Sequence, residues 1–308
     1  MDLELQNCLA CDGEDLREYI TTSDMMHRGD ESFTFAKCND CHLVMLTPRV
    51  PLDQLSEYYQ SFYLPYRGAA AWGKYAYLVE RDQRKIDRQR VRTALRYTSL
   101  SAANSVLDVG CGKPTFIQAL HGATGAQCLG SDFSDHGWAG DADQYSNINL
   151  HTGLPSEIVT DGPVDLITMW HYLEHDYQPT ETLQQMLAHS HNGTRLIIEV
   201  PDHDGSTRQK YGSKWAGYHT PRHTGLYTID SMTKLLSRSG WKVVDSYRSG
   251  TLDPYTLAWM SKMEQSGIDW SASMEPRFWS YVAGMMMYSP RKLQKEGHGF
   301  MTVVAEPS

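Results

Sequence analysis

Six cysteines are the residues of this 308-residue chain whose spacing points most directly to chemistry. Four of them form two Cys-x-x-Cys pairs, Cys8 with Cys11 and Cys38 with Cys41. Each pair can turn two thiolates toward one tetrahedral ion, so two such pairs in a cytosolic chain favour a structural Zn²⁺ site over disulfides. Four thiolates leave no open coordination position for catalysis, and a redox-active pair is the alternative interpretation.

A glycine-rich turn lies farther along the chain, in the sequence DVGCGKPTF (108–116). Gly110 and Gly112 can adopt backbone angles that other residues avoid, and they let a ligand approach the main chain closely. Asp132 ends the next apolar run, where a carboxylate can accept hydrogen bonds from ribose hydroxyls. This combination indicates an adenosine cofactor. The alternative is an ordinary tight turn followed by an ordinary surface aspartate.

The same turn discriminates between two cofactors. A nicotinamide dinucleotide would use Gly-x-Gly-x-x-Gly with its pyrophosphate over a helix N-terminus, but Thr115 stands at the sixth position here. Pro114 falls at about the first helical position, where its missing N–H matters little to a cofactor without phosphate. S-adenosylmethionine carries no phosphate, and Asp108 suits the need for an acid near its ammonium group. The turn therefore favours S-adenosylmethionine.

Alternating strands and helices must position this turn. Apolar runs typical of buried strands alternate with amphipathic segments from residue 105 onward, which predicts an α/β fold with a doubly wound, seven-stranded, mostly parallel sheet. In such a sheet the ligand binds at the carboxyl ends of the strands. The expected strands are 105–109, 126–132, 148–150, 164–170, 195–200, 241–247 and 299–307, and the expected helices are 115–122, 179–190 and 229–240.

Composition divides the chain into three regions. We expect a small zinc ribbon over 1–47, a tyrosine-rich helical linker or lid over 48–100, and a cofactor-binding domain over 101–308 with a helical insertion at about 251–296. Six tyrosines lie between residues 58 and 77. Such an aromatic cluster suits either a packed core or a lid on a flat ligand.

Charge and hydropathy exclude some partners. The net charge is −9 and the isoelectric point about 5.8, which argues against a nucleic-acid partner. No run approaches the roughly 18 apolar residues that a membrane span needs, and the acidic N-terminus is unlike a signal peptide. We therefore expect a cytoplasmic protein without a membrane partner. The oligomeric state is not fixed by the sequence, and a dimer is one option.

Several motifs occur in the order typical of a known family. The segments VLDVGCGKPTF, LGSDFS, VDLITMWHYLEHDYQP and TRLIIEVPD resemble successive motifs of class I S-adenosylmethionine-dependent methyltransferases. WAGYHTPRHTGLYTIDSMTKLLSRSGW resembles a later block in a branch that has an N-terminal zinc ribbon. That branch includes sugar C-methyltransferases and other small-molecule methyltransferases. The resemblance implies the cofactor S-adenosyl-L-methionine, a small-molecule acceptor and a place in secondary metabolism.

The resemblance also implies which residues contact the cofactor. Asp132 matches the ribose acid, and Trp170 matches a wall of the cofactor pocket. The segment HTGLPSEI (151–158) lacks an obvious acid at the position where many members of the family hold the adenine amine, so backbone groups near Gly153 and Leu154 are expected to contact it. The full cofactor set is Asp108, Gly110, Cys111, Gly112, Asp132, Phe133, Gly153, Leu154, Trp170 and His171.

Histidine is the side chain best suited to remove an acceptor proton near neutral pH. By motif position His223 matches the proposed base of the resembling sugar C-methyltransferases, and a structural histidine bonded to backbone is the alternative. Tyr218 and His219 are expected to contact the acceptor, and Arg222 to hold an anionic group on it. His175 completes the catalytic candidates.

His171 and His175 would share a helix face if a helix began at His171. Cofactor-side or packing roles are expected for both, ahead of direct proton transfer.

The sequence is also compatible with two other functions. One is a non-catalytic binding module that uses the zinc ribbon to dock a partner. The other is an enzyme that keeps the cofactor but changes the reaction, such as cyclisation of the cofactor's own aminobutyl group.

Overall fold

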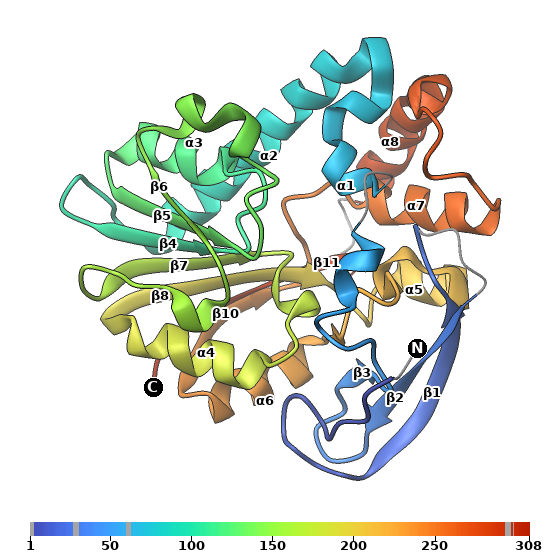
Figure 1. Cartoon of the computed structure of the whole chain (residues 1–308), viewed down its shortest axis with the longest axis horizontal. Coiled ribbons are helices and arrows are strands. Elements are labelled where there is room, and N and C mark those ends of the chain that lie inside the picture. The colour runs from blue at the N-terminus through green and yellow to red at the C-terminus, as the bar shows by residue number, and fades with distance from the viewer. Residues whose placement is uncertain (1–2, 27–30, 60–62, 293–296, 298) are drawn as a thin grey trace.

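A seven-stranded sheet forms the centre of the computed structural model, which describes residues 3–26, 31–59, 63–292, 297 and 299–308 (Figure 1). Its strand order is β10-β11-β8-β7-β4-β5-β6, and only β11 runs antiparallel to its neighbours. The predicted doubly wound, mostly parallel sheet is thereby confirmed. The strands are β4 (Ser105–Val109), β5 (Gln127–Asp132), β6 (Asn149–Thr152), β7 (Val164–Trp170), β8 (Ser190–Pro201), β10 (Trp241–Tyr247) and β11 (Phe300–Pro307).

Helices cover both faces of this sheet, α2 and α3 on one side and α4 and α6 on the other (Figure 1). Alternate residues of each strand pack against the helices on opposite faces, because successive side chains of a strand point in opposite directions. On β4, Val106 packs with Ile117 of α3, whereas Leu107 belongs to the cluster that contains Leu183 of α4 and Leu235 of α6. The helices are α2 (Ala76–Tyr97), α3 (Thr115–Thr124), α4 (Pro179–Ala188) and α6 (Ile229–Arg238).

The end of α3 differs from the sequence-based expectation. The helix runs to Thr124 and stops at Gly125, which has a φ of 74°. Gly122, the expected stop, lies inside the helix, since only a glycine in the left-handed conformation ends a helix in this way. Pro114 precedes the first helical residue as the N-cap, one position earlier than expected.

The N-terminal strands build a second, four-stranded sheet with the order β1-β2-β3-β9. Three of its strands precede residue 47: β1 (Leu16–Ser23), β2 (Ser32–Cys38) and β3 (Val44–Leu46). The fourth, β9 (Gly225–Leu226), comes from the connection between β8 and α6 of the large sheet. The N-terminal region therefore completes its sheet with a segment from far along the chain, since Val44 pairs with Leu226.

A third region holds the tyrosine-rich segment against the helices that precede β11. Trp72, Trp259, Trp270 and Phe278 are buried together there. The elements are α1 (Leu64–Arg67), η2 (Gly68–Tyr75), α7 (Tyr255–Gln265), η8 (Glu275–Arg277) and α8 (Phe278–Lys292). Residues 60–62 of the expected lid and 293–296 of the expected insertion lie outside the described residues. Among the helices that are described, none is long and apolar enough to cross a membrane.

Short elements complete the chain. They are α5 (Ser206–Tyr211) and the 3₁₀ turns η1 (Leu55–Tyr58), η3 (Ala139–Tyr145), η4 (Pro155–Glu157), η5 (Leu173–His175), η6 (Gly212–Lys214) and η7 (Ala216–Tyr218).

Arg222 joins these regions at their common boundary. Its side chain is fully buried, and its guanidinium donates hydrogen bonds to the carbonyls of Met25 (2.7 Å), Met26 (3.5 Å) and Tyr58 (2.9 Å). It also lies over the ring of Tyr63, 4.6 Å from the centroid. One side chain thus satisfies backbone acceptors of both the N-terminal sheet and the tyrosine-rich segment.

Replacing this side chain should destabilise the whole chain. We expect Arg222→Ala to lower the free energy of unfolding by about 3 kcal/mol or more, since buried carbonyls lose their donors. Urea unfolding measures the change. Arg84→Ala, on the exposed side of α2, is the matched control and should stay within about 0.5 kcal/mol. An Arg222→Ala chain as stable as this control would contradict the assigned role.

Candidate functional site

The glycine turn and Asp132 meet at the carboxyl edge of the large sheet. Gly110 and Gly112 have φ angles of 73° and 51°. A side chain at Gly110 would collide with Tyr172, whereas one at Gly112 would meet none of the described residues within 4 Å. The backbone N–H of Gly112 donates to Oδ2 of Asp132 over 2.9 Å. The turn and the carboxylate are thus fixed to each other at the end of adjacent parallel strands, β4 and β5.

Asp108 and Cys111 lie deeper than Asp132. Asp108 is buried, accepts a hydrogen bond from the hydroxyl of Thr168 over 2.6 Å, and has its pKa raised to about 7 by burial. Burial also raises the pKa of the Cys111 thiol, which packs close to Gly130. Cys111 is therefore held as a neutral thiol against the sheet.

The other predicted cofactor residues are more widely spread. Phe133 is exposed directly after β5, and Leu154 is exposed where its N–H donates to Oε2 of Glu157 over 2.7 Å. Gly153 sits beside the same carboxylate. Trp170 is buried edge-on against Phe116, with a centroid separation of 5.3 Å. Trp170 thus packs against α3 on the face of the sheet covered by α2 and α3.

These residues suit an adenosine cofactor that lacks phosphate. An oriented carboxylate stands at the end of β5, where ribose hydroxyls need an acceptor. Gly112 leaves the surface of the turn open. Pro114 removes one N–H at the start of α3, where a bound phosphate would need donors.

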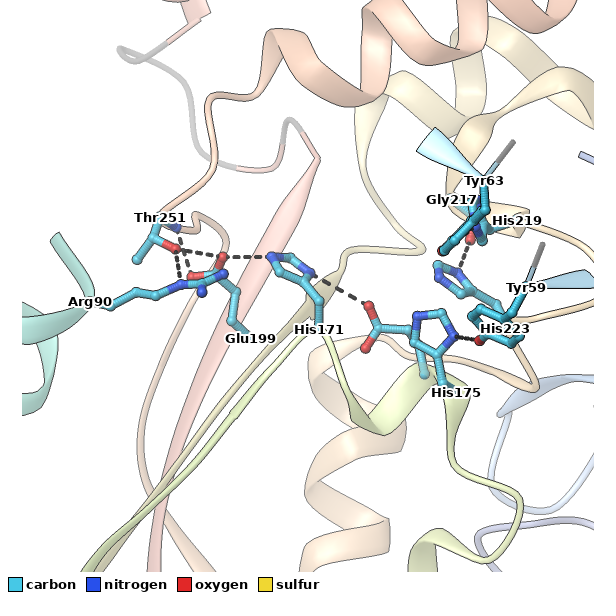
Figure 2. Close-up of polar contacts among 11 residues, drawn as sticks. Tyr59, Tyr63, Arg90, His171, His175, Glu199, Gly217, His219, His223 and Thr251 are labelled. Atoms are coloured by element: carbon cyan, nitrogen blue, oxygen red, sulfur yellow. Dashed lines mark hydrogen bonds and ion pairs between the residues drawn. The ribbon is translucent and has the colours of Figure 1, made fainter. Parts of the chain in front are cut away.

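Three histidines gather next to this edge (Figure 2). The ring centroid of His223 lies 4.5 Å from that of His175 and 5.0 Å from that of His219. Burial lowers the pKa of all three side chains, so each imidazole is held in its neutral form. The structure therefore brings together the histidines of two segments that are about 45 residues apart in sequence.

The tautomer of His223 follows from its hydrogen bond. Its Nδ1 lies 2.8 Å from the carbonyl oxygen of Gly217, and a carbonyl can only accept (Figure 2). Nδ1 must carry the proton, which leaves a lone pair on Nε2. His223 is thus both bonded to backbone and equipped with a bare ring nitrogen.

Two tyrosines of the linker orient the other histidines. The hydroxyl of Tyr59 lies 3.1 Å from Nδ1 of His175, and that of Tyr63 lies 3.0 Å from Nε2 of His219. The ring of Tyr59 also contacts Phe133, at a centroid distance of 5.5 Å. The tyrosine-rich segment therefore connects the histidines to the loop after β5.

Glu174 is a buried carboxylate within this group. Its Oε1 lies 3.5 Å from Nδ1 of His171, while Oε2 is buried with no hydrogen-bond partner among the described residues. One ligand-type atom from each of Glu174, His175 and His223 lies within 4.8 Å of the others. An unpaired carboxylate oxygen thus stands beside two neutral imidazoles.

His171 bridges Glu174 to a second buried carboxylate, Glu199. Its Nε2 lies 3.0 Å from Oε1 of Glu199. Burial alone would lower the pKa of His171, but hydrogen bonds to Glu174 and Glu199 raise it to about 9. His171 is therefore an imidazolium at neutral pH, shared by two carboxylates.

Glu199 is held from its other side as well. Its carboxylate accepts hydrogen bonds from the N–H of Thr251 over 2.7 Å and from the hydroxyl of Thr251 over 3.0 Å. Burial would raise the pKa of Glu199, but the hydrogen bond from His171 helps to lower it. Figure 2 shows the series of contacts from Arg90 through Thr251 and Glu199 to His171.

The helix face proposed for His171 and His175 does not form. η5 contains only three residues, Leu173–His175, and His171 lies before it with a φ of 59°. A non-glycine residue at positive φ is uncommon and concentrates at functional sites. The two side chains are linked through Glu174 and not through a shared face.

Two residues of the later block are engaged by packing or by backbone hydrogen bonds. Tyr218 is fully buried, with its ring 5.2 Å from those of Phe35 and Trp215. Arg222 is occupied by backbone carbonyls and does not present its guanidinium to an acceptor, contrary to expectation. Both side chains support the loop that carries His219 and His223.

Four cysteines form a separate cluster at the end of the N-terminal sheet. Sγ of Cys8 lies 3.4 Å from that of Cys41, and Sγ of Cys11 lies 3.5 Å from that of Cys38. Tetrahedral zinc with Zn–S bonds of about 2.3 Å places sulfurs about 3.8 Å apart, close to these values. The donor set and its spacing fit a Zn²⁺ ion.

The two cysteine turns share one backbone geometry. The residues after Cys11 and Cys41, Asp12 and His42, have φ angles of 58° and 67°. Each donates its N–H to the carbonyl of the first cysteine of its pair, over 2.8 Å and 3.0 Å. The turns are thus equivalent, as expected for two halves of one tetrahedral site.

Sequence reasoning missed four contributors: Glu174, Glu199, Tyr59 and Tyr63. Glu174 precedes His175 directly, and Glu199 occupies an otherwise apolar strand, so each carried a local signal. The local sequence around Tyr59 and Tyr63 does not indicate which histidines they contact, because those histidines lie more than 100 residues away.

The model of a methyltransferase-domain family matches residues 78–246, more than half of the chain. The chain belongs to this family and has the class I S-adenosylmethionine-dependent methyltransferase fold. The comparison with curated proteins gave no match.

Solved structures show the same fold at low sequence identity. The cyclopropane synthase MmaA2 from Mycobacterium tuberculosis is 14% identical, with a TM-score of 0.51, over 71% of this chain and 83% of that chain. The mycolic acid cyclopropane synthase CmaA1, complexed with S-adenosylhomocysteine (SAH) and CTAB, is 13% identical, with a TM-score of 0.51 and the same coverage. The cyclase SpnF is 18% identical, with a TM-score of 0.50, over 72% of this chain and 80% of that chain.

Proposed function

We propose that the protein is an S-adenosylmethionine-dependent methyltransferase that acts on a small-molecule acceptor, with His223 as general base. The observation that carries the proposal is the bare Nε2 of His223, fixed by the hydrogen bond from Nδ1 to Gly217 and placed among neutral histidines. S-adenosylmethionine supplies a methyl group on a positively charged sulfur. Gly110, Gly112 and Asp132 would hold that cofactor at the carboxyl edge of the sheet.

The proposed proton transfer uses groups already in place. The acceptor's O–H, N–H or C–H proton passes to Nε2 of His223, while the electron pair left behind forms the bond to the methyl carbon. The methyl carbon would come from bound S-adenosylmethionine, and the electron pair of its S–CH₃ bond would remain on sulfur. Burial lowers the basicity of His223, and the carboxylate of Glu174 lies where it would stabilise the imidazolium that forms.

Positioning is the other requirement of methyl transfer, because the acceptor must line up with the sulfur–methyl bond and water must stay out. The tyrosine-rich segment suits this task, since Tyr59 contacts both Phe133 on the cofactor side and His175 on the acceptor side. Tyr66 adds a ring contact to His136, at a centroid distance of 4.4 Å. We propose that this segment closes the reaction site.

We further propose that the four cysteines bind one structural Zn²⁺ ion. The cluster packs into the same apolar core as Leu173 and Trp241 of the large domain. β3, which follows the second cysteine pair, pairs with β9, and β9 directly follows His223 and Thr224. The ion would therefore stabilise the four-stranded sheet, and with it the loop that carries His223.

Loss of one thiolate should empty this site. We expect Cys38→Ser to reduce the zinc content of the purified protein from one ion per chain to near zero, because three remaining thiolates bind zinc far more weakly. Metal analysis by mass spectrometry measures the change. Cys128→Ala, a buried cysteine outside the cluster, is the control and should retain the ion. Unchanged zinc in Cys38→Ser would refute the four-thiolate site.

Removal of the Asp132 carboxylate should weaken cofactor binding. We expect Asp132→Ala to raise the Kd for S-adenosylmethionine by about 10- to 100-fold, since hydrogen bonds to a charged group contribute about 1.5–3 kcal/mol. Isothermal titration calorimetry gives both constants. Asp161→Ala, in an exposed loop, should bind like the wild type. Equal affinity in Asp132→Ala would reject the ribose contact.

Replacement of the base should separate binding from chemistry. We expect His223→Gln to lower kcat by about 10²- to 10⁴-fold, with the Kd for S-adenosylmethionine changed less than about threefold. Transfer of the isotope-labelled methyl group to a panel of small-molecule acceptors measures turnover. His191→Gln on the surface is the control. Full turnover in His223→Gln would remove the base assignment, and product formed from the cofactor alone would indicate cyclisation.

A further inference from the structure

The cluster of Glu174, His175 and His223 has the composition of a metal site as well as that of a proton-transfer site. Two imidazoles and one carboxylate form a donor set typical of zinc and of non-haem iron centres. One ligand-type atom of each residue lies within 4.8 Å of the other two. The cluster is distinct from the four-cysteine site, which uses sulfur donors only.

Each of the three side chains is also fixed at the atom that would face away from an ion. Nδ1 of His223 donates to the carbonyl of Gly217, and Nδ1 of His175 lies 3.1 Å from the hydroxyl of Tyr59. Oε1 of Glu174 faces His171 at 3.5 Å. Metal ligands in proteins are held in this manner by partners on their outer atoms, which set the tautomer and the ring orientation.

Two of the inner atoms offer an electron pair to an ion. Oε2 of Glu174 is buried and unpaired among the described residues, although Glu174 as a whole is only 2% exposed. An unsatisfied buried carboxylate oxygen costs free energy that a bound cation would recover. Nε2 of His223 carries a lone pair because Nδ1 holds the ring proton and donates it to the carbonyl of Gly217. Two unused donor atoms therefore meet beside the second imidazole.

We propose that Glu174, His175 and His223 bind a divalent transition-metal ion, and that the bound ion blocks proton transfer by occupying the lone pair on Nε2 of His223. Nitrogen donors select ions such as Zn²⁺, Co²⁺ or Fe²⁺ over Mg²⁺ and Ca²⁺, which prefer oxygen ligands. Metal binding by these three residues does not depend on the proposed function. Inhibition by the bound ion rests on the proposed role of His223 as general base. A lone pair cannot serve an ion and a proton at once, so metal and catalysis exclude each other.

Cobalt is the probe that separates this site from the cysteine cluster. The test uses the full chain with the cysteine site filled by zinc, titrated with Co²⁺ alone. We expect one further equivalent of Co²⁺ whose visible spectrum lacks the strong thiolate-to-cobalt charge-transfer absorption, because the ligands are nitrogen and oxygen. In the wild-type protein, proton NMR should show two paramagnetically shifted, solvent-exchangeable imidazole N–H signals, one for each ligating histidine.

Conservative variants locate the ion. Glu174→Gln and His223→Gln should each weaken Co²⁺ binding by at least tenfold, while the surface control His191→Gln should bind like the wild type. Failure to bind a second equivalent at millimolar Co²⁺ would overturn the site. Binding that persists unchanged in both Glu174→Gln and His223→Gln would overturn it too, as would an NMR spectrum without shifted imidazole signals.

Activity tests the inhibition part. At a free Co²⁺ concentration ten times its Kd, methyl transfer by the wild type should fall about tenfold, in proportion to the fraction of chains without the ion. Full turnover with Co²⁺ bound would overturn the claim that metal and proton compete. A chain that binds Co²⁺ as described but transfers no methyl group would support the metal site and count against the proposed function, so the two failures are distinguishable.

Discussion

The buried guanidinium of Arg222 is the interaction on which the arrangement of the site depends. It stands in the loop between His219 and His223, and its donors reach carbonyls of the N-terminal region and of the tyrosine-rich segment. A buried charge is stable only when its hydrogen bonds are satisfied, so these backbone segments must keep their positions for the loop to keep its own. The adjacent pairing of β3 with β9 acts in the same direction. The site is therefore built at the junction of three regions and not within one of them.

A second set of contacts runs from the sheet to the site and pairs buried charges of opposite sign. Two carboxylates, Glu174 and Glu199, are buried, and the imidazolium of His171 lies between them. Thr251 supplies further donors to Glu199. Burial keeps His175, His219 and His223 as neutral rings, which is the protonation state that either proton acceptance or metal binding requires. The charged and the neutral histidines thus have separate tasks.

Local signals in the sequence account for the fold and for part of the site. The strand and helix runs placed all seven strands, because hydrophobic periodicity reflects burial directly. The glycine turn and Asp132 came out as neighbours, since parallel strands bring their carboxyl ends to one edge. Predictions were wrong where the local sequence allowed more than one partner for a side chain or more than one end for a helix. Arg222 could have faced an acceptor but is satisfied by backbone, and the end of α3 moved to the glycine that takes a positive φ.

The sequence by itself determined the sheet, the spacing of the two cysteine pairs, the glycine turn and the presence of histidines in two motifs. Only the tertiary structure decided that His175 and His223 lie side by side, that one oxygen of Glu174 has no hydrogen-bond partner among the described residues, and that Tyr59 and Tyr63 contact the rings of His175 and His219. The physical reason is the distance along the chain over which the deciding interactions act. Strands, turns and the two Cys-x-x-Cys turns are set by neighbours a few residues away, whereas the tautomer, charge and partners of a buried side chain depend on groups that folding brings from distant parts of the chain.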